Sequence, residues 1–358
     1  MDNVTHTLFA LTLARTPLGR RRGAAAALVL ASNAPDVDIV TALGGSANYL
    51  AWHRGPTHGP LGVVGLGLVT AAIVWGAGRF FAHRTSSRAD GDADASSFAG
   101  LAAVSMVGIL AHILMDLPTS YGTRLLSPFS WRWFTMDLLP IIDVYLLIIL
   151  VGGLILGRGS ASRRRTAAIV ALVLMAANYG VRIGAHQRAL AAAGRTFGPR
   201  LPPPCDPRQA FRSLVDSWPR VKPASDGSCL IETAAIPSFL SPFQWRVIAR
   251  LTDAYEIYDT NSIDFEGPAG PPARISNEWT PLVVEAARTP TAQVLLGFSR
   301  FPAARVEQDA GRSVVQFSDM RFAIPLALEQ PPSRRSALFT VTVTFDPGGS
   351  IVQERLGD

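Results

Sequence analysis

Most histidines of this chain, together with a set of aspartates, lie beside long apolar runs, where ionisable side chains are costly and usually functional. Imidazole and carboxylate groups together suit Zn, Mn, Fe or Ni better than Ca or Mg. We therefore predict a site for a divalent metal, with zinc as the first choice and manganese or iron as alternatives. The predicted ligands are His6, Asp36, Asp38, His53, His58, His112 and Asp116.

The spacing of these residues supports a shared site. His112 and Asp116 are four residues apart on an expected helix, so both side chains fall on one face and can bind one ion. Asp36 and Asp38 flank one residue in an expected loop, which offers two carboxylates to a cation. In segment 53–58 a tight turn at Gly-Pro could bring both histidines inward. Seven ligands exceed what one tetrahedral zinc takes, which predicts either two metals or a mixture of ligands and residues that orient them.

Structural alternatives exist for each element. A single His-x-x-x-Asp pair is more often a hydrogen bond on a helix surface, and Asp36 could simply end a helix.

Asp137 and Asp143 are predicted as the catalytic base or as residues that orient the ligands. Arg54 and Arg124 could bind an anionic headgroup or phosphate, or could extend to the membrane interface.

Apolar runs set the expected architecture. Of the 358 residues, 48% are hydrophobic and only 17% charged, which is too apolar for an ordinary soluble chain. Four runs have the roughly 18–22 residues that a bilayer core requires. They are 60–81, 98–117, 139–156 and 166–185, preceded by two shorter apolar runs at 4–14 and 23–34 that could form a half-inserted hairpin.

Charge between the runs predicts orientation. Arginines concentrate in loops 15–22, 82–97 and 157–165, so these loops are expected in the cytoplasm. The alternating spans then bring His58, His112, Asp116, Asp137 and Asp143 to the opposite, extracytoplasmic face. The net charge of +6 could also suit nucleic acid, but its position beside apolar runs favours membrane orientation, and no nucleic-acid partner is expected.

A second domain is expected after the spans. We predict a helical polytopic membrane domain over 1–190, a Pro-rich linker over 191–207 and a small β-rich or α+β extracytoplasmic domain over 208–358. Alternating apolar residues predict strands at 293–301, 313–322 and 338–345, the last followed by a hairpin turn. Cys205 and Cys229 lie in this domain and could pair in an oxidising compartment, or stay as buried thiols.

Several motifs in combination resemble a known family. Asp2-x-x-Thr5-His6, Pro35-Asp36-x-Asp38, His53-Arg54-Gly55-x-Thr57-His58, His112-x-x-x-Asp116, Tyr121-Gly122-Thr123, Pro128-Phe129-Ser130 and Asp137-x-x-x-x-x-Asp143 are similar to the bacterial inner-membrane, metal-dependent hydrolases of the YdjM-like, LexA-associated type. The resemblance covers about residues 1–190 and implies a membrane-bound hydrolase with a divalent metal, but no substrate. Gly59 departs from it, since a hydroxyl residue is common at that position.

Taken together, the sequence predicts a multi-pass protein of the bacterial inner membrane that carries out metal-assisted hydrolysis at the outer face. A site at the outer face of the membrane favours a lipid or lipid-linked substrate, or another phosphoester. Two alternatives stay open, namely a non-enzymatic membrane metal carrier and an interaction module anchored by the spans. The oligomeric state is not indicated.

Overall fold

The computed structural model describes residues 1–84, 97–198, 201–206, 210–211, 220–221, 227–263, 272–322 and 339–357. These residues form two compact units. Unit 1 contains Met1–Ile39 and His53–Gly184, and unit 2 contains Val40–Trp52 and Ala185–Asp358. Segment 40–52 thus belongs with the C-terminal part of the chain. Of the expected linker 191–207, residues 199, 200 and 207 lie outside the described part.

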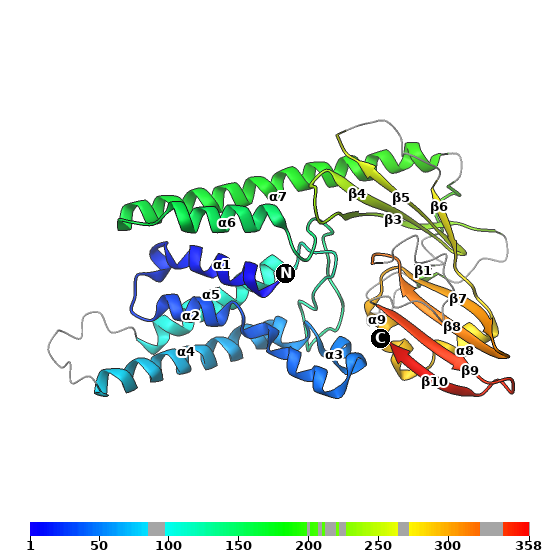
Figure 1. Ribbon diagram of the computed structural model, residues 1–358, viewed down its shortest axis with the longest axis horizontal. Coiled ribbons are helices and arrows are strands. Elements are labelled where there is room, and N and C mark those ends of the chain that lie inside the picture. Colours follow the sequence, from blue (N-terminus) through cyan, green and yellow to red (C-terminus); the bar gives the residue numbers. More distant parts are fainter. Residues whose placement is uncertain are drawn as a thin grey trace. The chain divides into compact units, whose positions relative to one another are not determined.

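Unit 1 is helical (Figure 1). Its elements are α1 (Asn3–Ala14), η1 (Pro17–Gly19), α2 (Ala24–Ala31), the first part of η2 (Ala34–Gly44), η3 (Pro56–His58), α4 (Pro60–Arg84), α5 (Phe98–Asp116), α6 (Val144–Leu156) and most of α7 (Ala161–Phe197). Asp2 caps the start of α1 by accepting from the Thr5 amide at 2.9 Å, and Ser97 caps α5 in the same way.

Four helical segments are long and apolar enough to cross a bilayer. They are Ala24–Gly44, Pro60–Ala82, Phe98–Asp116 and Ala161–Gly194. Three of these confirm predicted spans. The expected span at 139–156 is shorter than predicted, because residues 139–143 are not helical and α6 has 13 residues. Conversely, α2 and η2 together make a longer apolar segment than the sequence suggested.

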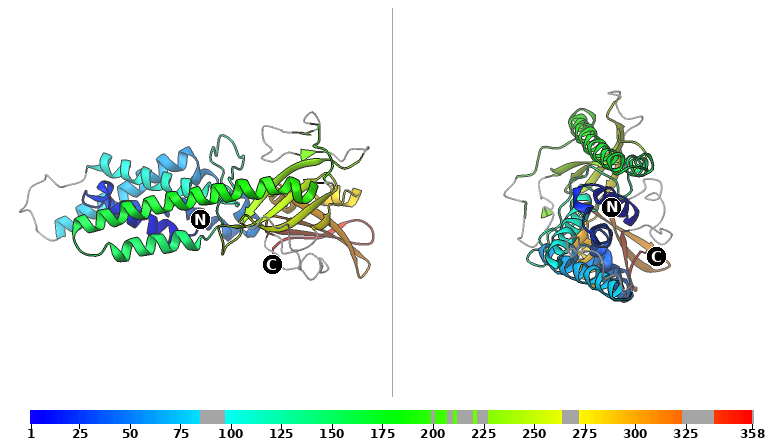
Figure 2. Two further views of the ribbon diagram at one scale, coloured as in Figure 1. Left: turned by 90° about the horizontal axis from the view of Figure 1, so that it is seen from above. Right: turned by 90° about the vertical axis from the view of Figure 1, so that its left-hand side faces the viewer.

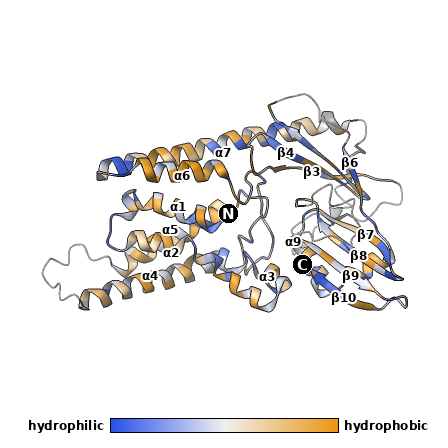
Figure 3. Ribbon diagram, viewed as in Figure 1, coloured by the Kyte–Doolittle hydropathy of each residue, from blue (hydrophilic) through white to orange (hydrophobic). Residues whose placement is uncertain are grey.

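Small residues allow the helices of unit 1 to pack closely. A Cβ at Gly108 of α5 would lie 2.8 Å from Ala31 Cβ of α2, and one at Gly153 of α6 would lie 2.8 Å from Ala171 Cβ of α7. Such small contacts are typical of helices packed within a membrane. Figures 1 and 2 show α6 beside the first part of α7, which extends well beyond it. Outward-facing residues such as Ile73 and Ile148 are apolar, as Figure 3 shows for α4 and α6.

A loop at 117–143 connects α5 to α6. Isolated bridges join Thr119 to Leu139 and Thr123 to Phe134. The loop ends at Asp143, whose Oδ1 accepts from the Leu146 amide at 2.9 Å and so caps α6. The bridges and the cap hold the loop that follows His112 and Asp116 in place.

Unit 2 contains the β-structure. One sheet has the order β3-β4-β5-β6 and the other β10-β9-β8-β7, with antiparallel pairing throughout. The strands are β3 (Leu230–Pro237), β4 (Gln244–Leu251), β5 (Ala254–Asn261), β6 (Ala273–Ser276), β7 (Pro302–Asp309), β8 (Arg312–Asp319), β9 (Thr340–Phe345) and β10 (Ile351–Leu356). A short pair joins β1 (Ala210–Phe211) to β2 (Arg220–Val221), and the helices are α3 (Ser46–Trp52), α8 (Pro281–Ala286) and α9 (Pro290–Phe298). The predicted fold class, a helical membrane domain followed by a β-rich domain, is confirmed.

Local predictions for unit 2 were partly wrong. Strands at 313–322 and 338–345 correspond to β8 and β9, although residue 338 lies outside the described part, and β9 continues into the expected hairpin with β10. The strand expected at 293–301 is instead helix α9, because Thr289 caps a helix with proline in its first turn. Ala292, Leu295 and Phe298 are buried at a helical spacing of three. The predicted Cys205–Cys229 disulfide is present.

Candidate metal centre

Unit 1 buries a group of imidazole and carboxylate side chains at one end of its helices. His6 comes from α1, Asp36 from η2, His58 from η3, and His112 and Asp116 from the last two turns of α5. The three histidines and Asp116 have no exposed surface, whereas Asp36 is 19% exposed. Burial of so many ionisable groups is unfavourable unless they are paired or bind an ion.

The separations within this group fit metal coordination. His112 Nε2 lies 3.1 Å from His58 Nε2, and Asp116 Oδ2 lies 3.5 Å from His58 Nε2 and 3.4 Å from His112 Nε2. Asp36 Oδ1 is 3.7 Å from His58 Nε2 and 3.6 Å from His112 Nε2. Ligand atoms at about 2.1 Å from a tetrahedral zinc are about 3.4 Å apart. The ligand atoms of His58, His112 and Asp116 are therefore spaced like three ligands of one ion, and Asp36 Oδ1 lies at a similar distance from the two histidine nitrogens.

The orientation of His112 also suits a ligand. Its Nδ1 lies 2.7 Å from the Ser32 carbonyl oxygen, which can only accept, so Nδ1 carries the proton and Nε2 presents a lone pair. Such a hydrogen bond from the remote ring nitrogen is usual for metal-binding histidines. Burial and the neighbouring His112 and Arg54 hold the pKa of His58 well below its usual range, so this ring too is neutral.

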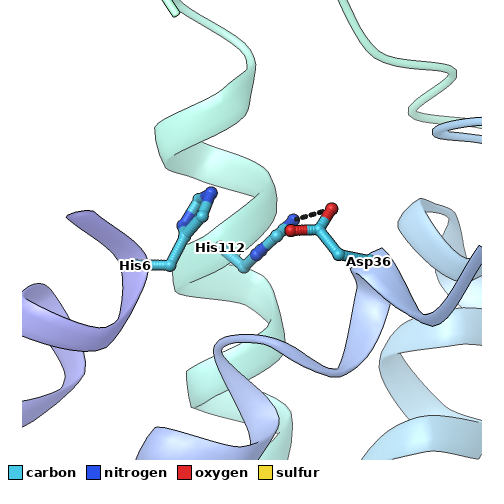
Figure 4. Close-up of side chains that lie close together, drawn as sticks. All are labelled: His6, Asp36 and His112. Carbon is cyan, nitrogen blue, oxygen red and sulfur yellow. Dashed lines mark ion pairs between the residues drawn. The ribbon is translucent and has the colours of Figure 1, made fainter. Parts of the chain in front are cut away.

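His6 adds a further nitrogen to the group. Its ring stacks on that of His112, with 3.8 Å between the ring centroids. Figure 4 shows the His112 ring between His6 and Asp36. Its Nε2 is 3.4 Å from Asp116 Oδ1, but neither ring nitrogen makes a hydrogen bond. Asp116 Oδ2 likewise has no hydrogen-bond donor. Buried polar atoms without partners are rare, so these atoms are available to contact an ion or a water molecule.

Two overlapping sets of residues can hold an ion. One is His6, Asp36 and His112, and the other is His58, His112 and Asp116. Both sets use His112, which has one nitrogen to offer because Nδ1 is occupied by Ser32. The overlap favours one ion shared by the five residues over two ions bound independently.

Asp38 lies beside His58 and pairs with His53, whose ring centroid is 6.3 Å from that of His58. Asp38 Oδ1 is 3.1 Å from His53 Nδ1, and Asp38 Oδ2 accepts from the Arg54 amide at 2.7 Å. Asp38 Oδ2 is also 3.7 Å from His58 Nδ1, on the side of that ring opposite Asp36. The Thr57 hydroxyl lies 3.0 Å from the same nitrogen. This arrangement fits Asp38 and Thr57 as residues that orient His58, although the sequence predicted Asp38 and His53 as ligands.

Arg54 is bound to protein groups on several sides. Its Nη2 donates to Asp116 Oδ1 at 2.9 Å and its Nη1 to the Gly122 carbonyl at 2.8 Å, while the amino group of Met1 also contacts Asp116 Oδ1. The backbone of Arg54 is left-handed, with φ of 52°. These contacts neutralise the Oδ1 side of Asp116 and leave Oδ2 towards the histidines. They favour a structural role for Arg54 over the predicted binding of substrate.

Arg124 and Asp137 lie in the loop after α5. The Arg124 guanidinium lies 4.5 Å from the centre of the Trp133 ring and 5.0 Å from that of Trp131, and burial lowers its pKa to about 10. Its amide donates to the Arg54 carbonyl at 3.1 Å. Asp137 Oδ1 accepts from the Thr135 hydroxyl at 3.2 Å.

Asp143, predicted as a catalytic base, contacts the Leu146 amide and the Arg182 guanidinium. Besides capping α6, its Oδ2 lies 2.5 Å from Arg182 Nη2, and both side chains are fully buried. Sequence reasoning missed Arg182, which lies near the end of the span predicted at 166–185 and was assigned no role. It also missed the Ser32 carbonyl, which no residue type could reveal. Thr57 was visible, since it lies within the His-Arg-Gly-Pro-Thr-His motif.

The N-terminal half of the chain is similar to known proteins. The sequence profile of a family described as "YdjM inner membrane protein" matches residues 1–189. A curated relative from Bacillus subtilis (strain 168), described as "Uncharacterized protein YfhP", is 26% identical over 157 residues. This match covers 41% of the present chain and 43% of the relative, so the chain spans less than half the length of that protein. No solved structure matches the chain.

Proposed function

The chain belongs to the YdjM inner membrane protein family, and from this premise and the buried cluster we propose that it is a membrane-bound, metal-dependent hydrolase. The observation that carries the proposal is the buried set of ligand atoms from His58, His112 and Asp116, which lie 3.1–3.5 Å apart, with Asp36 Oδ1 at 3.6–3.7 Å from the two histidines. Mixed imidazole and carboxylate ligands at this spacing favour zinc, with manganese or iron as alternatives. His6 is the additional ligand that would complete a five-coordinate site.

The remaining residues have separate roles in this proposal. A bound divalent ion would lower the pKa of a water molecule and polarise an ester or phosphoryl oxygen. Asp38 orients His58, and Arg54 holds Asp116 in place. His53 is hydrogen-bonded to Asp38 through Nδ1 and is 12% exposed, so it is the residue best placed to accept and return a proton. We therefore prefer His53 to Asp137 or Asp143 as the acid–base residue.

The substrate we propose is an ester or phosphoester in the headgroup region of a membrane lipid. Asp36 is the only exposed member of the ligand set, so substrate would approach from its side. Its neighbours on η2, Val37 and Ile39, are 47% and 57% exposed. Exposed apolar side chains beside a ligand, at the end of spanning helices, suit an amphiphilic molecule better than a soluble one. Arginine placement further supports an extracytoplasmic site and C-terminal domain.

A membrane metal carrier is the principal alternative. A carrier would need ligands that continue through the bilayer, as polar groups inside spans usually mark ion paths. In the described part of α4 and α5, the buried mid-span polar residues are Thr70 and Ser105, which are weak ligands for transition metals. This favours hydrolysis over transport.

Metal analysis combined with an activity assay tests the proposal. The full chain in detergent would be compared with His112→Ala and with His186→Ala, a matched control whose ring lies 5.2 Å from Trp245 in unit 2. We expect about one metal ion per chain in wild type and control, and almost none in His112→Ala. Hydrolysis of bis(p-nitrophenyl) phosphate and of phosphatidylglycerol in mixed micelles should be lost together with the metal.

Each result has a distinct meaning. Full metal content in His112→Ala would show that the cluster is not the metal site. Metal bound at wild-type level, without hydrolysis of either substrate but with ion uptake in proteoliposomes, would favour the carrier. The interaction-module alternative predicts neither metal nor hydrolysis.

A further inference from the structure

Three arginines from distant parts of the chain converge at the end of unit 1 opposite the metal centre. Arg15, at the end of α1, donates through Nη1 to the Leu154 carbonyl at 2.9 Å and lies 3.3 Å from the Gly153 carbonyl, at the end of α6. Arg158 and Arg164 lie in and after the turn that joins α6 to α7. A Cβ at Gly157, the residue before Arg158, would lie 2.8 Å from Arg15 Nη1, so the Arg15 guanidinium lies against the turn that carries Arg158. The positive charges of Arg164 and Arg158, after burial, lower the pKa of Arg15.

Within the described part of the chain, the positive charges of these arginines are not balanced by acidic groups. Among the described residues, no carboxylate forms an ion pair with Arg15, Arg158 or Arg164. Arg164 Nε donates to the Gly159 carbonyl at 3.0 Å, which positions the side chain but leaves its charge uncompensated. The start of α7 adds the positive end of a helix dipole at the same place. Like charges held together in this way attract an anion.

The surroundings of the three arginines are apolar. Ile155 and Leu156, at the end of α6, are 48% and 69% exposed although they belong to an apolar helix. An anion that contacts both the arginines and these side chains must carry hydrocarbon next to its charge. We propose that Arg15, Arg158 and Arg164 bind the phosphodiester of an anionic phospholipid whose acyl chains lie along α6.

Membrane orientation alone does not account for this arrangement. Arginines that orient a protein need only lie on the cytoplasmic side, and they act equally well when scattered. Here Arg15 is held by two carbonyls from a helix about 140 residues further along the chain, and it is directed to the turn that carries the other two. Basic pockets between the ends of spanning helices are typical sites for acidic lipids.

Native mass spectrometry of the full chain in neutral detergent tests the proposal. Phosphatidylglycerol would be titrated into wild type, Arg158→Gln/Arg164→Gln and a triple variant that also carries Arg15→Gln, with phosphatidylcholine as the uncharged comparison. Each arginine removed should weaken phosphatidylglycerol binding roughly fivefold, so about 25-fold for the double and about 100-fold for the triple variant. The double variant keeps the contact between Arg15 and α6. Weaker lipid binding by this variant therefore does not come from loss of that contact.

Arg79→Gln is the matched control. Arg79 lies near the end of α4 with its guanidinium 4.9 Å from the centre of the Trp75 ring. This variant should bind phosphatidylglycerol as wild type does. Equal binding by wild type and the double variant, or an equal loss in Arg79→Gln, would overturn the proposal. Inorganic phosphate that displaces the lipid at equal concentration would overturn it too, because the site would then recognise phosphate without its acyl chains.

Discussion

The buried ion pair between Asp143 and Arg182 offers a sharp test of how unit 1 is held together. Both side chains are fully buried, and Asp143 also caps α6 through the Leu146 amide. Asp143→Asn keeps an acceptor for the cap, since Asn and Asp cap helices about equally well. It leaves the Arg182 guanidinium buried without its counter-charge, which costs about 3–5 kcal/mol. We expect the midpoint of thermal unfolding to fall by on the order of 10 °C.

A second variant removes both charges. In Asp143→Asn/Arg182→Met, an unbranched apolar side chain replaces the guanidinium and no unpaired charge remains. Replacing a buried ion pair by uncharged groups often leaves stability unchanged or increases it. Most of the decrease in the midpoint of thermal unfolding should therefore be reversed. The assay is tryptophan fluorescence of detergent-purified protein heated at one fixed rate, because unfolding of such proteins is often irreversible. Metal content should equal that of wild type in both variants.

Two outcomes would refute this reasoning. A single variant that unfolds within about 2 °C of wild type would mean that the pair does not stabilise the helices. A double variant that regains stability and metal but no hydrolysis would mean that Asp143 takes part in the reaction, as the sequence predicted.

Three further predictions follow from the same structure. Asp38→Asn should weaken metal binding about 10- to 100-fold without abolishing it, because Asp38 orients a ligand; dialysis against metal buffers measures this, and complete loss would mean that Asp38 is itself a ligand. Cys205→Ser should destabilise unit 2 by about 3 kcal/mol by opening a loop of 24 residues, measured by denaturant unfolding, with no effect on metal content. In a background without the native cysteines, Ser350→Cys should react with an impermeant thiol reagent on intact cells and Ser162→Cys only after permeabilisation; the reverse pattern would invert the proposed topology.

Much of the membrane architecture followed from the length of the apolar runs. The spans at 60–81, 98–117 and 166–185 correspond to α4, α5 and α7, because a bilayer requires about 20 apolar residues whatever the tertiary contacts. Counting spans also placed His58, His112 and Asp116 at one end, where the structure brings them together. Each span moves the chain to the other side of the membrane. In a chain with few spans, this alternation strongly limits which segments can meet.

Tertiary contacts decided what the sequence did not reveal. Leu139 to Ile142 are apolar like the helix that follows, but Leu139 pairs with Thr119 in a bridge and Asp143 caps a later start. Arg182 was not singled out from the sequence, because its partner Asp143 lies about 40 residues earlier in a loop whose course no periodicity predicts. At 293–301 an apparent alternation hid a helical spacing, and the cap at Thr289 was the signal that should have decided it.

The different roles of Asp36 and Asp38 show why spacing alone could not separate ligands from the residues behind them. A loop was expected there, and a loop lets two carboxylates turn towards one ion. The segment is instead a 3₁₀-helix, in which residues two apart point in different directions because there are three residues per turn. Asp36 Oδ1 therefore lies 3.7 Å from Nε2 of His58, and Asp38 Oδ2 lies 3.7 Å from Nδ1 of the same ring. One carboxylate lies beside the nitrogen that faces His112, and the other lies beside the nitrogen that would set the ring's tautomer. The same two-residue spacing thus places one carboxylate beside each nitrogen of His58, a distinction that depends on the helix type and not on the residues themselves.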